Sequence, residues 1–300
     1  MSTKGKVLIG FGVWLLGAVL LVVLLGSEGK NEEFTPTDEF KLDPWVDLKI
    51  GPVDMSINKA VLYLVLACGL TAWAMTYIAR KMTSDTPNRV QTAVEALYDL
   101  TYNQIARGNM SREMSLRWFP FVATLFFFIW TSNLIGYIPL PTNTEHSTHI
   151  FGLEVPTLAL YAATANISVP VILTLVVWFA YQYEGIRAKG FFPYVRGLIP
   201  AGTPGPLKGF VFVIEVISQF VRIISLSVRL FANILAGHML ILFMAGGLAV
   251  ILGIAALGWL TLPLAIIFFL LEVGLVATLQ AFIFATLASI YFGEATAAHH

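Results

Sequence analysis

Residues 210–247 have the sequence FVFVIEVISQFVRIISLSVRLFANILAGHMLILFMAGG, which is apolar except for a few polar side chains. A helix that crosses a bilayer needs about 20 mostly apolar residues, so this stretch predicts a membrane helix. The whole chain shares its character: of 300 residues, 57% are apolar and 12% are charged, against roughly 25% charged residues in soluble domains. The composition therefore predicts a polytopic membrane protein and excludes a water-soluble globule.

Apolar runs long enough to span the membrane occur in five places. They lie at residues 7–26, 58–79, 118–140, 158–182 and 210–292. Because the runs are continuous rather than alternating, they predict helices and not the strands of a membrane barrel. The fifth run is far longer than one crossing needs. We therefore expect an all-α membrane protein with about five to six membrane helices.

The long run 210–292 is interrupted between Gly258 and Pro263, which divides it into about 49 and 30 residues. With a rise of about 1.5 Å per residue, the first part would measure about 73 Å as one helix. It must either fold back near Gly246 and Gly247 or cross the membrane at a strong tilt, with bends. Apolarity alone leaves both arrangements open.

The segments between the spans differ in charge. Segment 27–56 contains eight acidic residues and three lysines, and segment 141–156 contains two glutamates and no lysine or arginine. Segments 80–117 and 183–209 contain six and four basic residues. Because basic loops stay on the cytoplasmic side, these two segments are predicted to be cytoplasmic and the acidic ones external. Equal totals of 18 basic and 18 acidic residues give no net field that would attract nucleic acid.

Residues 1–56 form a separate N-terminal part in this prediction. Lys4 and Lys6 precede the first apolar run, as in the charged region of a signal peptide. The run is long for a signal peptide and no A-x-A-like cleavage site follows it. We therefore favour a retained helix, with a cleaved signal as the alternative, followed by an external acidic segment.

A helix of another kind is predicted between the second and third spans. Thr86 suits the N-cap, Pro87 the first helical position and Gly108 the residue after the last turn. Apolar and charged side chains fall on different sides between these positions, which indicates an amphipathic helix on the cytoplasmic surface. Such a helix is either a simple connector or a docking surface for a partner.

Polar residues recur along one side of the helix predicted for 210–247. They are Glu215, Gln219, Arg222, Arg229 and Asn233. Steps of four, three, seven and four residues keep them on one face. Ionisable side chains are costly inside a bilayer and are functional candidates by default. For the first half of this polar stripe, a place among the lipid headgroups is the simpler alternative.

Arg229 is surrounded by apolar sequence, and an arginine at the bilayer centre costs about 2.5–3.5 kcal/mol. Because a guanidinium does not deprotonate, we expect a partner: Glu272 in the last helix or a carboxylate of another chain. A purely structural ion pair is the alternative. His238 and Glu272 form a second candidate pair, since a histidine beside a carboxyl group can relay protons. Ordinary interhelical hydrogen bonding is the alternative for this pair.

The sequence contains no motif for nucleotide binding, dinucleotide binding or metal binding. The sequence has no P-loop, no dinucleotide-binding glycine pattern and no metal-ligand spacing among its histidines. Its one cysteine, Cys68, excludes an intrachain disulfide. We therefore expect no catalytic residue, no metal and no cofactor.

Three segments occur in the order found in a known family. They are SNLIGYIP at 132–139, SVRLFANILAGHML at 227–240 and LQAFIFATLASIY at 279–291. They closely resemble subunit a of F-type ATP synthases, the static half of a rotary motor in the membrane. The resemblance begins at about residue 57. It implies a membrane domain at 57–300 whose last two helices are long, tilted and paired as a hairpin.

The resemblance also implies roles in proton translocation. The residues concerned are Arg229, Glu215, Asn233, His238, Glu272 and Gln280. Arg229 corresponds to the family's essential arginine, which faces a ring of c subunits, and the two amides match positions near that interface. Glu215 matches a glutamate 14 residues before the arginine. His238 and Glu272 resemble a polar pair near an aqueous half-channel.

One spacing departs from the family pattern. Seven residues are expected between the glutamate of the last helix and its glutamine, but Glu272 and Gln280 are eight apart. On a regular α-helix eight steps leave two side chains about 80° apart, whereas seven nearly align them. A local bulge in the helix would restore the alignment.

The implied function is ion transport without catalysis by this chain. Two offset half-channels pass protons to and from carboxylates of the c-ring, which couples proton flow to rotation and ATP synthesis. The implied partners are the c-subunit ring, b-type stator subunits, the rest of the ATP synthase and the lipid bilayer. The long N-terminal extension favours a bacterial inner membrane over an organelle. A secondary transporter and a membrane scaffold are the alternatives, but no repeated halves support the first.

Overall fold

The computed structural model describes residues 3–25, 40–50, 53–54, 56–81, 89–150, 153–200 and 202–297. They divide into two compact units, which we describe separately. The first unit comprises Met1–Asp43, Pro139–Tyr161 and Leu235–Val276, and the second comprises Pro44–Ile138, Ala162–Ile234 and Ala277–His300. The long helix α8 (Lys208–Leu242) contributes to both units.

The fold is all-α within its membrane part, as predicted. Among the described residues, five helices are long and apolar enough to cross a membrane. They are Lys59–Tyr77, Arg112–Ile135, Ser168–Lys189, Gly205–Ile251 and Ala256–Thr296. The first apolar run forms helix α1 (Thr3–Leu25), in which the shorter stretch Leu8–Leu21 is apolar. The chain is a multi-pass membrane protein.

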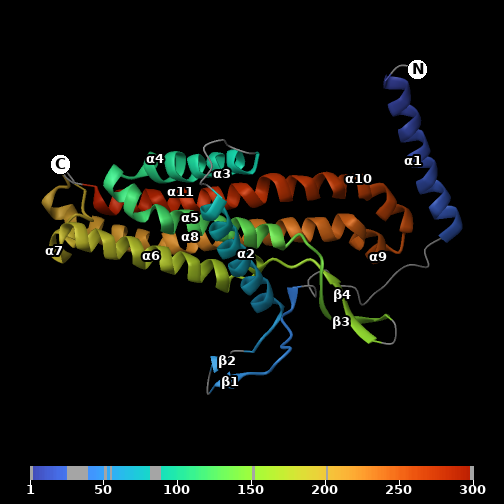
Figure 1. The fold of residues 1–300 in the computed structure, drawn as a ribbon, viewed down its shortest axis with the longest axis horizontal. Helices are drawn as coiled ribbons and strands as arrows, with labels where there is room; N and C mark the ends of the chain where they lie inside the picture. The colour runs from blue at the N-terminus through green and yellow to red at the C-terminus, as the bar shows by residue number, and fades with distance from the viewer. Residues whose placement is uncertain are drawn as a thin grey trace. The chain divides into compact units, whose positions relative to one another are not determined.

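The second unit is a bundle of helices that contact one another closely. Its longer helices are α2 (Lys59–Lys81), α3 (Arg89–Asp99), α5 (Arg112–Ile135), α6 (Ser168–Lys189) and α11 (Ala277–Thr296), with part of α8 (Figure 1). Helix α11 packs against α5 and α6 with a row of fully buried alanines at 277, 281, 285 and 288. Small residues let membrane helices approach closely, and this row explains the contact.

The predicted amphipathic helix is present and packs on α5. It begins as α3, continues through a π-helical turn, η2 (Leu100–Ala106), and ends with α4 (Arg107–Asn109). Gly108 therefore lies inside the last turn rather than after it, and the predicted cap at Thr86 and Pro87 lies outside the described residues. Tyr98 and Tyr102 each meet the ring of Phe119 edge-on, with centroids 5.2 Å apart.

Two predicted spans begin at other residues than expected. Helix α5 begins at Arg112, six residues before the apolar run, because the Ser111 hydroxyl caps it by accepting a hydrogen bond from the Met114 amide at 3.4 Å. Helix α6 begins ten residues late, at Ser168. Of the ten residues before it, the first two end strand β4 (Leu153–Ala159), which pairs antiparallel with β3 (Leu140–Ile150), and three others form the 3-10 turn η3 (Ala163–Ala165). A second short hairpin, β1 (Lys49–Ile50) and β2 (Val53–Asp54), precedes α2.

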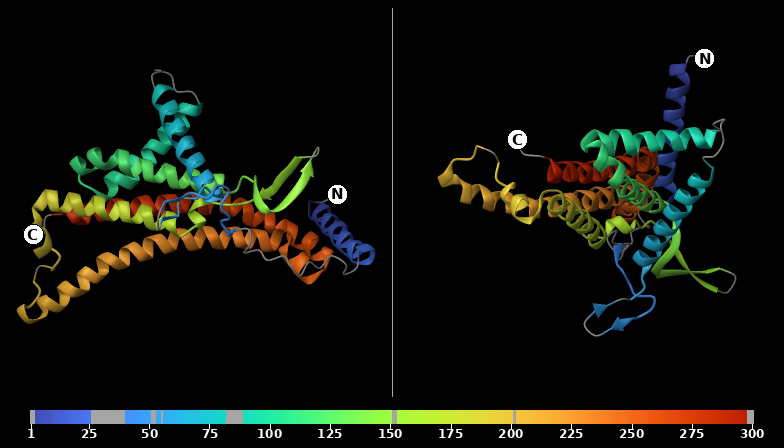
Figure 2. Two further views of the ribbon diagram at one scale, coloured as in Figure 1. Left: turned by 90° about the horizontal axis from the view of Figure 1, so that it is seen from below. Right: turned by 60° about the vertical axis from the view of Figure 1, so that its left-hand side comes forward.

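The first unit contains the reversal of the long apolar run. Helix α8 leads through a π-helical turn, η5 (Phe243–Gly247), into α9 (Leu248–Leu252), and the chain then turns back into α10 (Ala255–Leu271) (Figure 2). The reversal occurs at Gly253, whose φ of 70° is left-handed, and at the extended residue Ile254. The Thr261 hydroxyl donates to the Met244 carbonyl at 2.7 Å and closes the hairpin.

The predicted break between Gly258 and Pro263 is therefore wrong by several residues. Pro263 lies inside α10, where the helix continues past it. Gly246 marks a kink, and the chain does not fold back there. The same unit includes α1, which packs against α10 with the Trp259 indole donating to the Trp14 carbonyl at 3.0 Å.

Candidate functional site

The predicted polar stripe lies on one unbroken helix. Helix α8 runs without interruption from Lys208 to Leu242, so Glu215, Arg222 and Arg229 have the helical spacing that the sequence predicted. Glu215 and Arg222 are partly buried, whereas Arg229 is exposed. The stripe therefore divides into a partly buried first part and an exposed second part.

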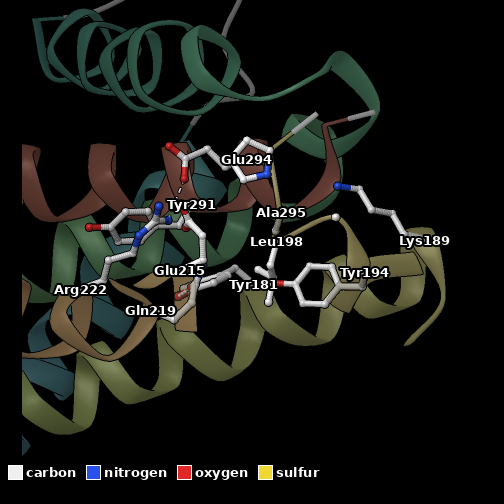
Figure 3. Close-up of a pocket in the computed structure, with 12 residues that line it drawn as sticks. Tyr181, Lys189, Tyr194, Leu198, Glu215, Gln219, Arg222, Tyr291, Glu294 and Ala295 are labelled. Atoms are coloured by element: carbon white, nitrogen blue, oxygen red, sulfur yellow. Dashed lines mark hydrogen bonds and ion pairs between the residues drawn. The ribbon is translucent and has the colours of Figure 1, made fainter. Parts of the chain in front are cut away.

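The first part of the stripe borders a cavity of about 370 Å³ within the second unit. Helices α6, α8 and α11 and the short helix α7 (Phe191–Arg196) supply its walls, together with the residues that follow α7. The lining side chains able to carry charge are Tyr181, Lys189, Tyr194, Glu215, Arg222, Tyr291 and Glu294 (Figure 3). The predicted cytoplasmic loop 183–209 forms part of this wall, so the cavity is predicted to open toward the cytoplasm.

A glycine turn positions α7 over the end of α6. Gly190 has a φ of 83°, a left-handed conformation that suits glycine. The turn brings the ring of Tyr194 against Gly185, where a side chain would overlap it. The Tyr194 hydroxyl then donates a short hydrogen bond of 2.5 Å to the Gln182 side chain. Burial raises the pKa of Tyr194 above its usual range, so Tyr194 stays neutral and works as a structural donor.

Arg222 forms an ion pair that the sequence did not predict. Its guanidinium lies 2.7 Å from a carboxylate oxygen of Glu294 on α11 and 4.8 Å from the centroid of the Tyr291 ring. Figure 3 shows the two charged groups pointing toward each other across the cavity wall. A charge-assisted hydrogen bond and a cation–π contact together fix the direction of this side chain.

Arg229 has no such partner in the same unit. Among the described carboxylates of the second unit, none forms an ion pair with it. Asn233, one turn further along α8, is exposed as well. The outer half of the stripe thus presents a permanently charged guanidinium and an amide on an open helix face.

Two amide side chains, those of Asn133 and Gln219, join helices, as such side chains commonly do in membranes. Fully buried Asn133 donates from its amide to the Ala277 carbonyl at 3.3 Å and accepts from the Thr164 hydroxyl at 2.7 Å. Gln219 of the stripe accepts a hydrogen bond from the Tyr181 hydroxyl at 2.7 Å, which ties α8 to α6.

His238 and Glu272 lie in the first unit and are both buried. Their exposed fractions are 1% and 7%. The Glu272 carboxylate lies directly against Gly237, where any side chain would overlap it. Since Gly237 precedes His238, the structure brings the predicted pair into one neighbourhood of the hairpin. Gln280 is buried in the second unit with an exposed fraction of 6%.

The bulge that the spacing called for is present. A π-helical turn, η6 (Glu272–Val276), begins at the glutamate and precedes α11. Such a turn adds about one residue to an α-helix, so eight residues cover nearly the rotation that seven cover elsewhere. π-Bulges of this kind often occur at functional sites.

Deletion of Gly274 should therefore be tolerated. The deletion removes the extra residue of the π-turn and leaves the regular spacing of seven, so the yield of folded protein in the membrane is expected to stay within about threefold of the parent. Deletion of Ala285 from the regular part of α11 is the matched control, because it rotates the rest of the helix by about 100° and should abolish assembly. Equal loss in both deletions would show that the π-turn does not absorb the extra residue.

Another carboxylate, Glu184 on α6, was missed by sequence reasoning. It is 3% exposed and lies 3.0 Å from Arg117 on α5 and 3.7 Å from Arg187. The two arginines neutralise a charge that would otherwise be costly to bury. This network ties α5 to α6 at the predicted cytoplasmic ends and has a structural role. Within the described residues, no group of His, Cys, Asp and Glu could hold a metal ion.

Fold and site together define a class: a multi-pass, all-α membrane protein whose longest described helix carries an exposed arginine and also lines a polar cavity. The family profile described as ATP synthase A chain matches residues 61–293. The chain is 33% identical over 268 residues to ATP synthase subunit a of Rubrobacter xylanophilus, covering 88% of this chain and 94% of the relative. It is 35% identical over 263 residues to ATP synthase subunit a of a Methylobacterium species, covering 87% and 96%.

A third relative, ATP synthase subunit a of Rhizobium rhizogenes, is 34% identical over 263 residues, with 87% of this chain and 96% of the relative covered. The chain therefore belongs to the ATP synthase subunit a family. It is a component of the ATP synthase complex and acts in ATP synthesis and proton transport.

Proposed function

We propose that this chain is the static, non-catalytic proton channel of its ATP synthase and works through Arg229. One observation carries the proposal: Arg229 is exposed on α8, and no described carboxylate of its own unit pairs with it. A guanidinium in apolar surroundings needs a counter-charge. A carboxylate on a passing c subunit supplies one and leaves again when the ring turns.

The size of the interaction fits a transient contact. A carboxyl group in lipid stays protonated because burial disfavours the charged form. At about 4 Å and an effective dielectric of about 20, a fixed positive charge stabilises the carboxylate by about 4 kcal/mol. That equals a factor of about a thousand in proton affinity, enough to make the passing group release its proton. The membrane potential supplies about 2.3 kcal/mol per charge per 100 mV and sets the direction.

Two separate polar regions supply the half-channels in this proposal. Glu215 borders the cavity that opens toward the predicted cytoplasmic side. The buried pair of His238 and Glu272 relays protons in the other half-channel. Exposed Asn233 lines the interface with the c-ring near the arginine, and buried Gln280 supports that region from within the second unit.

In this proposal the chain contacts the c-ring, b-type stator subunits and lipid. It is located in a bacterial inner membrane. Residues 57–300 form the membrane domain of the family, and 1–56 form an added N-terminal helix and external segment. The catalytic nucleotide chemistry belongs to other subunits of the complex.

Purification of the complex through a tag on this chain tests the proposal. The c-ring should co-purify, and proteoliposomes of the complex should acidify on addition of ATP. A complex assembled without this chain is the control and should hydrolyse ATP without pumping protons. Isolation of the chain free of c subunits, or pumping by the complex that lacks it, would contradict the proposal.

A further inference from the structure

The stripe on α8 carries two arginines, and only one of them suits the proposed exchange of protons. Arg222 and Arg229 are seven residues apart and share a helix face, so about 10 Å of rise separates them. Of the two, Arg222 lines the cavity through which the carboxylate would exchange protons with the cytoplasm. A free cation at that position would keep the carboxylate deprotonated where it must take up a proton.

We propose that Glu294 is a positioning residue: it neutralises the Arg222 guanidinium and orients it toward α11. The charge of Arg222 then does not lower the proton affinity of the c-ring carboxylates, and Arg229 alone acts on them. This inference rests on the proposed function. Glu294 neutralises the Arg222 guanidinium at 2.7 Å and draws it toward α11. Tyr291, one turn earlier on α11, holds the guanidinium against its ring at 4.8 Å.

The surrounding elements favour Glu294 as the partner. The titratable side chains around the cavity are Tyr181 and Lys189 on α6, Tyr194 on α7, Glu215 on α8, and Tyr291 and Glu294 on α11. Glu294 is the carboxylate among them that forms an ion pair with Arg222. Lys189 lies at the opposite end of the cavity in Figure 3 and does not replace Arg222 in this contact.

The expected size of the effect follows from distance. At about 10 Å and an effective dielectric of about 20, an unpaired Arg222 would lower the proton affinity of a carboxylate at the level of Arg229 roughly tenfold. When Arg222 is paired with Glu294, the two opposite charges form a short dipole. At about 10 Å such a dipole changes the proton affinity of the carboxylate only slightly. Neutralising Arg222 therefore matters more for the exchange than tethering α8 to α11.

Three variants test whether Glu294 neutralises the charge of Arg222 or only links α8 to α11. They are Glu294→Gln, Arg222→Gln and the double variant that carries both substitutions. ATP-driven acidification of inverted membrane vesicles is measured against the pH of the cytoplasmic side, and co-purification of the c-ring reports assembly. Glu294→Gln leaves Arg222 charged and should lower pumping about tenfold, with activity recovering at about one pH unit lower. Arg222→Gln leaves Glu294 unpaired, and this negative charge raises the proton affinity of the passing carboxylate, so the variant should pump at least as well as the parent with its pH profile shifted to higher pH. The double variant removes both charges and should pump within about twofold of the parent, with the parent's pH profile.

A mere tether predicts another pattern, because all three variants break the ion pair. Equal loss in the three variants, or parent-like pumping and pH profile in Glu294→Gln, would overturn the inference. If Glu294→Gln fails to assemble, the double variant decides between the two explanations. Assembly of the double variant supports the proposal that the unpaired charge of Arg222 is harmful. Failure of the double variant to assemble supports a tethering role of the ion pair. Arg229→Ala in the same vesicles keeps the two hypotheses apart: normal pumping by that variant rejects the proposed function itself.

Discussion

Replacement of Arg229 by alanine or lysine is expected to abolish ATP-driven proton pumping, with at least a hundredfold loss. Alanine removes the charge that makes a c-ring carboxylate release its proton, an interaction of about 4 kcal/mol at close range. Lysine restores a positive charge, but its ammonium group does not behave as a guanidinium does. An amine loses its proton readily when desolvated, whereas a guanidinium stays charged and offers a planar fork of donors to a carboxylate.

The measurement is acidification of inverted vesicles on addition of ATP, with c-ring co-purification as the control for assembly. Arg222→Gln is the matched control, because it removes an arginine from the same face of the same helix. It should leave pumping intact, since Arg222 already has Glu294 as its partner at 2.7 Å. If Arg229→Ala assembles and pumps like the parent, the proposed role of Arg229 is wrong.

Helical periodicity was enough to predict the membrane helices and the polar stripe. Apolar runs of spanning length and the steps between Glu215 and Asn233 depend on the local sequence alone, and α8 has both features. The ends of the helices were less predictable. Ser111 adds charged residues to the start of α5 through its cap, and β4 takes residues that were assigned to α6.

The reversal of the long hairpin shows why glycine and proline mislead in a membrane. Gly246 and Gly258 were the predicted breaks, and Pro263 supported the second, whereas Gly253 was not singled out. Membrane helices tolerate proline because neighbouring groups satisfy the freed backbone. Only Gly253 adopts the left-handed conformation that turns the chain, and this choice depends on the packing of α10 against η5 and α9.

The ion-pair partners were not predictable, because they come from distant parts of the chain. Glu294 is 72 residues from Arg222, and Glu184 is 67 residues from Arg117. A helical pattern shows which face of a helix is polar but not which helix lies opposite. The π-turn at Glu272 was accessible for another reason: the spacing of eight residues departed from a known pattern, and a bulge was the simplest geometry to absorb it.

Replacement of Gly136 by alanine is expected to lower the stability of the folded protein by about 2 kcal/mol, as overpacking of a tight contact does. Gly136 ends α5 and lies against the residue before the turn η3 (Ala163–Ala165). A Cβ atom at Gly136 would come within 2.8 Å of the Cα atom and 3.2 Å of the backbone nitrogen of Ala162. Backbone atoms cannot swing aside as a side chain does, so the turn itself must shift.

That shift would also disturb buried Asn133, which accepts from the Thr164 hydroxyl at 2.7 Å. Gly69→Ala is the matched control, because Gly69 lies on α2 and a Cβ atom there would have no neighbouring heavy atom within 4 Å. Thermal unfolding of the detergent-solubilised complex should show a lower midpoint for Gly136→Ala and an unchanged or slightly higher one for Gly69→Ala. Equal midpoints in the two variants would mean that the contact at Ala162 yields without cost, and that Gly136 is a glycine for some reason other than space.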